Sequence, residues 1–132
     1  MVVVFGGRTT DTSALNDIWG LRRHRDGRWD WVPAPTKSTG IQPTARYQHS
    51  TTFIGSTIIV VGGRTNNVGE SVGLEVYDTE TSEWHWFPAI QRFRHACVTL
   101  DNWLFVHGGF EHESPNVPTS GIIKLDTYAM FQ

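Results

Sequence analysis

The chain has 132 residues, enough for one domain, and its hydrophobic content of 39% with six Trp and seven Phe can bury a core. A formal net charge of −2 and a pI near 6.3 argue against general binding to nucleic acids or acidic membranes, which needs a basic surface. No segment approaches the roughly 20 apolar residues of a membrane span, and the start, MVVVF, is too short and too uncharged for a signal peptide, so we expect a cytoplasmic or nuclear protein.

The first unit, residues 1–34, is predicted to contain three strands. They are expected at Val2–Phe5, Asp17–Leu21 and Trp29–Val32. A basic run, Arg22–Arg28, forms the turn before the last of them, and we interpret it as solvated. Compared with the units that follow, this unit lacks a first strand.

The middle unit, residues 46–89, is predicted to contain four antiparallel strands. They are expected at His49–Ile54, Thr57–Val61, Gly73–Tyr77 and Trp84–Phe87. Gly55 and Ser56 form a two-residue hairpin signal between the first two strands. A polar loop, Arg64–Ser71, precedes the third, and Pro88 is expected to end the fourth because proline cannot donate to a ladder.

The third unit, residues 92–132, repeats the pattern. Strands are expected at His95–Leu100, Trp103–His107 and Ile122–Leu125, with a stub at Tyr128–Phe131. The single cysteine, Cys97, cannot form an internal disulfide, and its place in an apolar strand favours a buried hydrophobic role over a reactive thiol.

These units are copies of one another. RYQHSTTFIGSTIIVVGGRT, which starts at Arg46, aligns without a gap with RFRHACVTLDNWLFVHGGFE, which starts at Arg92, and MVVVFGGRT matches its second half. WDWVPA recurs as WHWFPA. Self-similarity at a period of about 40–55 residues is typical of stacked-repeat or propeller proteins. Each glycine pair is predicted to let the backbone turn sharply and approach a neighbouring repeat, which a Cβ would prevent.

The combination of a glycine pair, an aromatic on the third strand and a tryptophan on the fourth resembles the kelch repeat. The aromatics are Tyr77, with Trp19 in the matching place, and Trp84, matched by Trp29. The resemblance covers essentially the whole chain and implies an all-β kelch-type β-propeller segment of about three four-stranded antiparallel blades. The third unit departs from the pattern because Leu125 stands where the tyrosine should be, so its blade is expected to be truncated.

A narrower resemblance concerns DIWGLRRHRDGRWDWVPAP followed by ARYQHSTTFIG, between Asp17 and Gly63. This stretch is similar to the kelch region of the protein phosphatases with Kelch-like domains of plants and alveolate protists. In that family a kelch propeller precedes a metal-dependent Ser/Thr phosphatase domain. The metal-ligating motifs of that domain are absent here, so the resemblance implies a regulatory or targeting part.

The candidate site is a set of arginine and aromatic side chains expected on one face of the blades, near Phe110. Its members are Arg8, Arg46, Arg64, Arg92, Arg94, Tyr47 and Phe93. Arginine suits a carboxylate or phosphate, and the rings offer apolar contact. The family resemblance implies an acidic or phosphorylated partner segment there. The alternative for each arginine is an ion pair or carbonyl contact with a neighbouring blade.

Catalytic and metal roles are not expected. His107 and His112 flank an acidic loop, but without further ligands they are interpreted as solvated residues rather than a zinc site. His49 and His95 occur at the same place in two repeats, which favours a role in blade geometry over general-base catalysis. We expect neither a cofactor nor an intrinsic phosphatase or hydrolase activity.

The favoured function is a non-catalytic protein-interaction module, regulatory or substrate-targeting for a Ser/Thr phosphatase. Two alternatives are a propeller-based enzyme of the oxidase type, which would bind copper through tyrosine and histidine, and a cytoskeletal binding protein. About eleven predicted strands fall short of the five to seven four-stranded blades usual in the kelch family. We therefore expect either a fragment, with the remaining blades in the parent chain, or two copies that meet head to tail.

Overall fold

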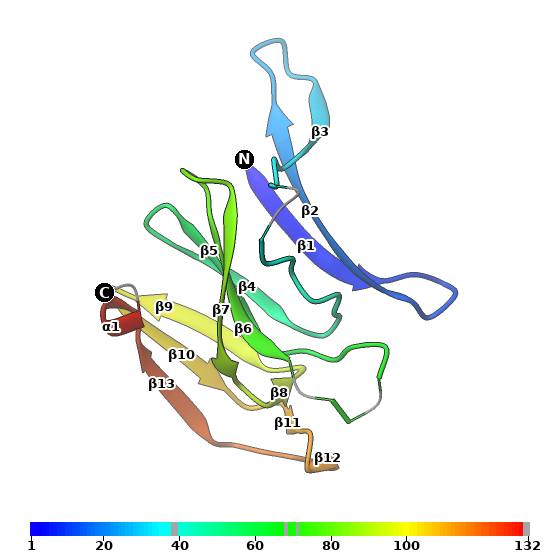
Figure 1. Ribbon diagram of the computed structural model, residues 1–132, viewed down its shortest axis with the longest axis vertical. Coiled ribbons are helices and arrows are strands. Elements are labelled where there is room, and N and C mark those ends of the chain that lie inside the picture. Colours follow the sequence, from blue (N-terminus) through cyan, green and yellow to red (C-terminus); the bar gives the residue numbers. More distant parts are fainter. Residues whose placement is uncertain (38–39, 68, 71, 131–132) are drawn as a thin grey trace.

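The computed structural model describes residues 1–37, 40–67, 69–70 and 72–130, almost all in antiparallel strands. Three main sheets follow one another along the chain and lie face against face (Figure 1). Parts of the predicted loop Arg64–Ser71 and of the predicted stub Tyr128–Phe131 lie outside the described residues. In the described part of the chain, no helix has the length and apolar character to cross a membrane.

The first sheet confirms the three strands predicted for its unit. It contains β1 (Val2–Arg8), β2 (Ala14–Arg23) and β3 (Trp29–Pro33), in that order. Val4 lies opposite Trp19, as Val60 lies opposite Glu75 in the middle sheet. Because both valines stand two positions before a glycine pair, Trp19 corresponds to Glu75. The expected match of Trp19 with Tyr77 is therefore wrong.

The fourth-strand tryptophans are also offset from the sequence match. Leu21 pairs with Trp31, as Tyr77 pairs with Trp84 in the middle sheet. Trp31, not Trp29, is thus the structural counterpart of Trp84. The repeated WDWVPA and WHWFPA letters hide a two-residue difference in register.

The middle sheet is a complete four-stranded blade. It contains β4 (Ser50–Ile54), β5 (Thr57–Val61), β6 (Gly73–Asp78) and β7 (Glu83–Ala89), in that order. Gly55 and Ser56 form the predicted tight turn. Pro88 does not end β7: Gly73 pairs with Ala89 and Leu74 with Phe87, so Pro88 occupies a bulge. This strand lies at the edge of its sheet, where proline is tolerated.

The third unit forms one three-stranded sheet and one small accessory sheet. The main sheet, in the order β13-β10-β9, contains β9 (Ala96–Leu100), β10 (Trp103–His107) and β13 (Ile122–Asp126). The accessory sheet, which the sequence did not indicate, contains β8 (Arg92–Phe93), β11 (Phe110–Glu111) and β12 (Ser114–Pro118). The predicted stub strand is wrong at Tyr128–Met130, and Phe131 lies outside the described residues. Thr127–Met130 instead forms one turn of helix, α1, and the Thr127 N–H and hydroxyl both donate to the Asn102 carbonyl.

Two hydrophobic clusters join the sheets. Between the first and middle sheets lie Phe5, Ile18, Ile58, Val60, Tyr77 and Trp84. Between the middle and third sheets lie Ile59, Val61, Leu74, Val76, Ile90, Leu104 and Val106, with Cys97 half-buried against them. Each sheet alternates its side chains between two faces, so the middle sheet is buried on both sides.

The glycine pairs bring consecutive repeats into backbone contact. Gly62 has φ +62, and a Cβ there would lie 2.2 Å from the Arg92 carbonyl oxygen. A Cβ on Gly6 would lie 2.8 Å from the Arg46 carbonyl oxygen. The Gly63 N–H donates to the Arg92 carbonyl at 2.8 Å. The predicted close approach at the glycine pairs is therefore confirmed.

Candidate functional site

Four of the predicted site residues form one continuous arginine–aromatic ladder. The Arg8 guanidinium lies 4.8 Å from the centre of the Tyr47 ring, and the Arg64 guanidinium lies 4.6 Å from the centre of the Phe93 ring. Tyr47 and Arg64 exchange two backbone hydrogen bonds, of 2.9 and 2.8 Å. Each arginine follows a glycine pair, and each ring belongs to the link into the next repeat. The same contact therefore recurs from one repeat to the next.

Arg94 joins this ladder through Gln48. Both residues occupy the left-handed region, with φ values of 55° and 59°, at equivalent places in two repeats. The Arg94 N–H donates to the Gln48 carbonyl at 2.9 Å. With the Gln48 amide oxygen assigned toward Arg94, that oxygen accepts from Nε at 2.9 Å and from Nη2 at 3.0 Å. No local signal in the sequence indicates Gln48, because neither its backbone conformation nor its partner can be read from neighbouring residues.

Three arginines of the ladder keep charge available for a ligand. Arg8 and Arg94 are exposed and Arg64 is half-buried. Among the described residues, no ion pair involves Arg8, Arg64 or Arg94. Guanidinium groups without a carboxylate partner retain their capacity for bidentate binding of carboxylate or phosphate.

Arg46 is placed differently from the expectation that it faces a ligand. Its side chain is 0% exposed, and Nη1 donates to the carbonyls of Gly62 at 3.1 Å and Gly73 at 2.8 Å. Nη2 pairs with the buried Glu75 carboxylate at 2.8 Å. Burial lowers the pKa of Arg46, and the Glu75 charge opposes that shift. Arg46 therefore ties together strands of its own blade.

Arg92 repeats this arrangement. It is 6% exposed, and Nη1 donates to the carbonyls of Gly108 and Gly121, both at 3.0 Å. Its carboxylate partner is the half-exposed Glu111, at 3.7 Å. Arg46 and Arg92 are therefore buried, unlike the exposed Arg8 and Arg94.

Phe93 is buried and anchors the end of the ladder. Its ring stacks on Phe110, with centres 5.6 Å apart, and lies 5.1 Å from the His112 ring. His112 Nε2 donates to the Gly63 carbonyl at 3.1 Å, so His112 belongs to a contact between repeats and is not a merely solvated residue. His107 is exposed. Among the described residues, no group of three or more His, Cys, Asp or Glu could hold a metal ion.

Two histidines link consecutive repeats. His49 Nε2 donates to the Phe5 carbonyl at 2.7 Å, and its ring meets the edge of the Phe5 ring. His95 Nε2 lies 2.8 Å from the Ser50 hydroxyl. Burial lowers the pKa of both histidines, and that of His95 falls to about 4. These contacts agree with the expected role in blade geometry.

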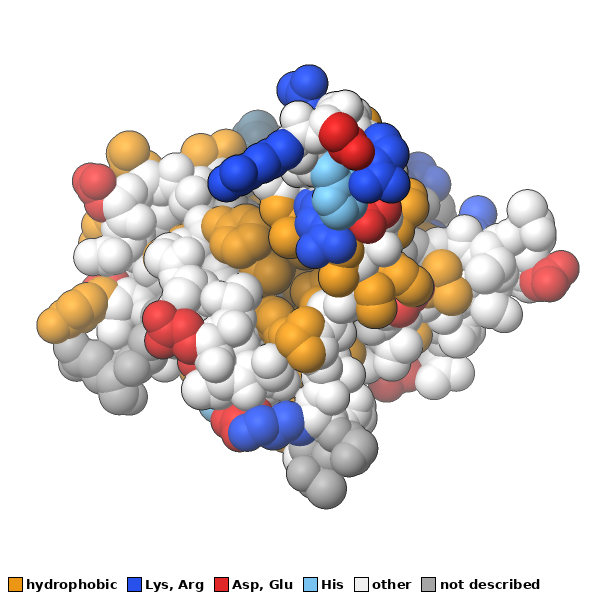
Figure 2. All heavy atoms as spheres, turned by 90° about the horizontal axis from the view of Figure 1, so that it is seen from above, with side chains coloured by type: hydrophobic (Ala, Val, Ile, Leu, Met, Phe, Trp, Pro, Cys, Tyr) orange, Lys and Arg blue, Asp and Glu red, His pale blue; other side chains and the backbone are white. Residues whose placement is uncertain are grey.

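The basic run Arg22–Arg28 forms a separate cluster in the turn between β2 and β3. Arg22 pairs with Asp30 at 3.1 Å, and Arg28 pairs with Asp26 at 2.6 Å. Seen from above, basic, acidic and histidine side chains gather beside exposed hydrophobic side chains (Figure 2). The carboxylates of Asp26 and Asp30 therefore neutralise much of the positive charge of this cluster.

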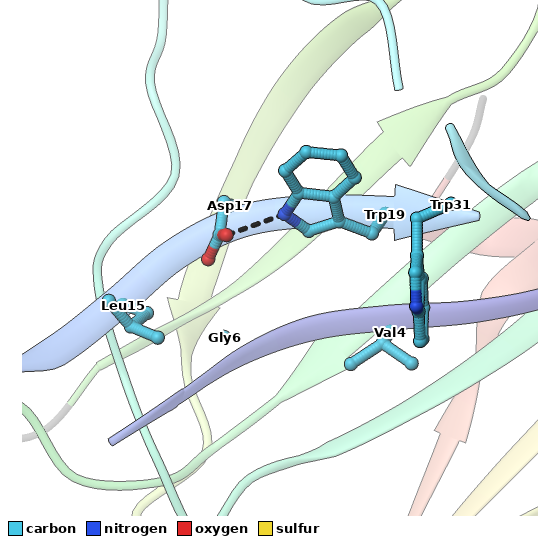
Figure 3. A pocket seen from close by; sticks show the side chains of 6 residues that line it. All are labelled: Val4, Gly6, Leu15, Asp17, Trp19 and Trp31. Atoms are coloured by element: carbon cyan, nitrogen blue, oxygen red, sulfur yellow. Dashed lines mark hydrogen bonds between the residues drawn. The ribbon is translucent and has the colours of Figure 1, made fainter. Parts of the chain in front are cut away.

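A hollow on the first sheet was missed by the sequence reasoning (Figure 3). It has a volume of about 430 Å³ and is lined by Val4, Gly6, Leu15, Asp17, Trp19 and Trp31. The Trp19 indole N–H donates to the Asp17 carboxylate at 2.6 Å. These residues come together because of the strand register, which cannot be inferred from the repeated sequence motifs.

Comparisons with known proteins identify relatives over most of the chain. Residues 1–130 match the model of the KLHDC2/KLHL20/DRC7 Kelch-repeats domain. The serine/threonine-protein phosphatase BSL2 of Arabidopsis thaliana is 28% identical over 135 aligned residues, which cover 83% of this chain and 13% of that protein. Human Kelch domain-containing protein 3 is 31% identical over 114 residues, 78% of this chain and 29% of that protein.

Kelch-like protein 25 of Rattus norvegicus is 35% identical over 85 residues, which cover 63% of this chain and 14% of that protein. The chain therefore matches between 13% and 29% of the length of these relatives. One relative is a phosphatase by name and the other two carry kelch names.

Proposed function

The chain belongs to the kelch-repeat family, and on this premise we propose that it is a non-catalytic protein-interaction module whose arginine–aromatic ladder binds an acidic or phosphorylated segment of a partner protein. The observation that carries the proposal is the repeated stacking of Arg8 on Tyr47 and of Arg64 on Phe93. Stacking fixes each guanidinium plane while its N–H edge stays available to an anion.

We further propose a regulatory or substrate-targeting role for a Ser/Thr phosphatase, in the cytoplasm or nucleus. The likeness to BSL2 over 83% of the chain supports this finer proposal. Determining the coding sequence on both sides of residues 1–132 tests it: an adjoining phosphatase domain supports the role, and an adjoining domain of another class contradicts it.

The test of the ladder uses two fluorescent octapeptides of equal length, one alternating glutamate with phosphoserine and one alternating lysine with serine. Fluorescence anisotropy should show that the acidic peptide binds and the basic peptide does not. Arg64→Glu should weaken acidic-peptide binding by at least about tenfold, equivalent to about 1.4 kcal/mol, because it places a like charge against the ligand.

The matched control is Arg25→Glu, which reverses an exposed arginine in the turn between β2 and β3. Affinity for the acidic peptide should stay within about twofold, a change below 0.5 kcal/mol. Equal losses in both variants would indicate binding by net charge alone. Loss of binding only in parallel with loss of thermal stability would assign Arg64 a structural role. Either outcome contradicts the proposal.

A further inference from the structure

The strand β12 is the outermost strand of the small accessory sheet, whose order is β12-β11-β8 (Figure 1). All five of its residues are exposed. Its register with β11 pairs Phe110 with Pro118 and Glu111 with Ser114, with an irregularity between the two pairs. Because few pairs hold this exposed edge strand, β12 can leave its sheet more easily than a strand of the main sheets.

Ser114 begins this strand and presents an accessible hydroxyl group. Its side chain is exposed, and among the described residues its hydroxyl has no hydrogen-bond partner. Pro115 follows, and a proline restricts the residue before it to an extended backbone. Of all the serines and threonines in the chain, Ser114 alone precedes a proline. The molecule therefore displays one extended Ser-Pro step on its surface.

An extended Ser-Pro step with a free hydroxyl has the form that a proline-directed protein kinase accepts. Such a kinase binds its substrate as an extended chain and holds the ring of the following proline in an apolar pocket. The γ-phosphoryl group of ATP passes to Ser114 Oγ, the hydroxyl proton goes to the catalytic aspartate of the kinase, and ADP leaves. Because the Ser114 side chain is already exposed, this transfer does not require the main sheets to unfold.

Acidic residues around Ser114 would make a phosphate there unfavourable for the pairing of β12. Glu111 lies opposite Ser114 in the strand register, and Glu113 precedes Ser114 in the chain. A phosphoserine adds a charge of about −1.5 to −2 at neutral pH. Like charges on directly opposite residues of neighbouring strands destabilise the pair. Phosphorylation should therefore separate β12 from β11.

The hairpin formed by β11 and β12 also supports the end of the arginine–aromatic ladder. Phe110 of β11 stacks on Phe93, and the ring of His112, in the turn between the two strands, lies 5.1 Å from the Phe93 ring. The Arg64 guanidinium lies 4.6 Å from the centre of that same ring. Separation of β12 from β11 would therefore loosen the support of Phe93, and the added negative charge would repel an acidic ligand.

We propose that Ser114 is a phosphorylation site for a proline-directed protein kinase, and that its phosphate opens the β11–β12 hairpin and weakens the binding of acidic segments by the ladder. The modification site rests on the exposure of Ser114, its place at the start of an edge strand and the proline that follows it. The effect on binding rests on the proposed function of the ladder, whereas the opening of the hairpin does not.

The first experiment incubates the full chain with ATP, Mg²⁺ and a mitogen-activated protein kinase, and tandem mass spectrometry locates the phosphoryl group. Ser114 should be modified. Pro115→Ala should slow the reaction at least about tenfold, because the kinase loses an apolar contact by which it selects its substrate. Pro118→Ala, which removes the other proline of β12, is the matched control and should keep the original rate. Absence of phosphate on Ser114, or equal rates for the two variants, overturns the site.

Hydrogen exchange then compares the phosphorylated chain with the unmodified chain. The backbone amides of residues 111–118 should exchange faster after phosphorylation. Glu111→Gln should reduce this increase, because it removes the charge opposite the phosphate. Exchange rates that phosphorylation leaves unchanged overturn the opening of the hairpin.

Fluorescence anisotropy with the acidic octapeptide measures the effect on the ladder. Phosphorylation should lower the affinity at least about threefold, because it places like charge near the ligand. Ser114→Ala treated with the same kinase should keep the affinity of the unmodified chain. Unchanged or tighter binding by the phosphorylated chain overturns the effect on the ladder. If the unmodified chain does not bind the peptide, the proposed function fails, and the mass spectrometry and hydrogen exchange still decide the site and the opening of the hairpin.

Discussion

At the scale of single residues, Arg46 and Glu75 form a buried ion pair, whose desolvation is costly. Both side chains are at most 1% exposed, and their charges are compensated by each other and by nearby carbonyl, N–H and hydroxyl groups. The Glu75 carboxylate also accepts from the Thr44 N–H and hydroxyl, at 2.9 and 2.8 Å. Removal of one partner therefore leaves a desolvated charge and several unsatisfied groups.

Glu75→Ala should lower the free energy of unfolding by about 3–5 kcal/mol, because Arg46 remains buried without its counter-ion. Urea denaturation monitored by circular dichroism measures this change. Glu111→Ala is the matched control: its half-exposed carboxylate lies 3.7 Å from Arg92, so the cost should stay below about 1 kcal/mol. Similar costs for the two variants would contradict the structural importance of the buried pair.

His95 should make the fold sensitive to mild acid. Burial, together with the nearby charges of His49 and Arg92, lowers its pKa from 6.5 to about 4. The unfolded chain therefore binds a proton first, and the folded state loses stability as the pH falls from about 6.5 towards 4. Above pH 6.5, the contribution of His95 to the free energy of unfolding does not change with pH.

Urea midpoints measured between pH 7 and pH 4 test this prediction. The midpoint should fall with pH in the unaltered chain, and His95→Gln should reduce the slope. His85→Gln, a change at an exposed histidine, serves as the control and should keep the original slope. An unchanged slope in His95→Gln would exclude His95 as a source of the pH dependence.

At the scale of elements, the glycine pairs act as contact points between repeats. Gly62→Ala should cost well above 3 kcal/mol, because a Cβ there combines a φ of +62° with a 2.2 Å approach to the Arg92 carbonyl oxygen. Gly7→Ala also falls at positive φ, +116°, but has no atom within 4 Å of its Cβ. It should cost about 1–2 kcal/mol. Thermal unfolding monitored by circular dichroism measures both changes. Equal decreases in melting temperature would show that backbone strain alone, and not the contact with the Arg92 carbonyl, explains the need for glycine at position 62.

Strand positions could be predicted from sequence, whereas their register could not. Thr57–Val61 and Trp103–His107 were predicted to the residue, because β-branched and aromatic runs bounded by turn residues are local signals. The offset of Trp31 against Trp84 arises from the hairpins β2–β3 and β6–β7: ten positions separate the paired residues Leu21 and Trp31, and seven separate Tyr77 and Trp84. The length and geometry of each hairpin turn set this register, so repeated letters do not reveal it.

The site shows the same division. Sequence repetition predicted that arginines and aromatics gather on one face, and the structure places Arg8 against Tyr47 and Arg64 against Phe93. It could not separate Arg46 from Arg64, because burial and the choice of partner depend on where each side chain points between blades. Glu75, which forms the buried ion pair with Arg46, is 29 positions further along the chain.

At the scale of the whole molecule, the two outer sheets each leave an apolar face open. On the first sheet Val4 and Trp31 are exposed, although their counterparts Val60 and Trp84 are buried in the middle sheet. On the third sheet Val98, Leu100 and Ile122 are exposed, each above 60%. The neighbouring sheets cover both faces of the middle sheet, whereas the first and third sheets each have a neighbour on one face among the described residues.

The isolated chain should therefore associate in solution, since exposed apolar faces and free strand edges favour contact between copies. Light scattering should report a mass above the 14.9 kDa of one chain, and the mass should rise with concentration. Leu100→Glu, which places a charge on the open face of the third sheet, should restore the monomer without loss of thermal stability.

Val117→Glu is the control for this variant. The Val117 side chain is similarly exposed, at 64%, but lies on β12, outside the main sheets, so the change should not alter association. A monodisperse, cooperatively unfolding species of 14.9 kDa at every concentration would contradict this prediction. It would show that the open faces are stable in water without a neighbouring blade.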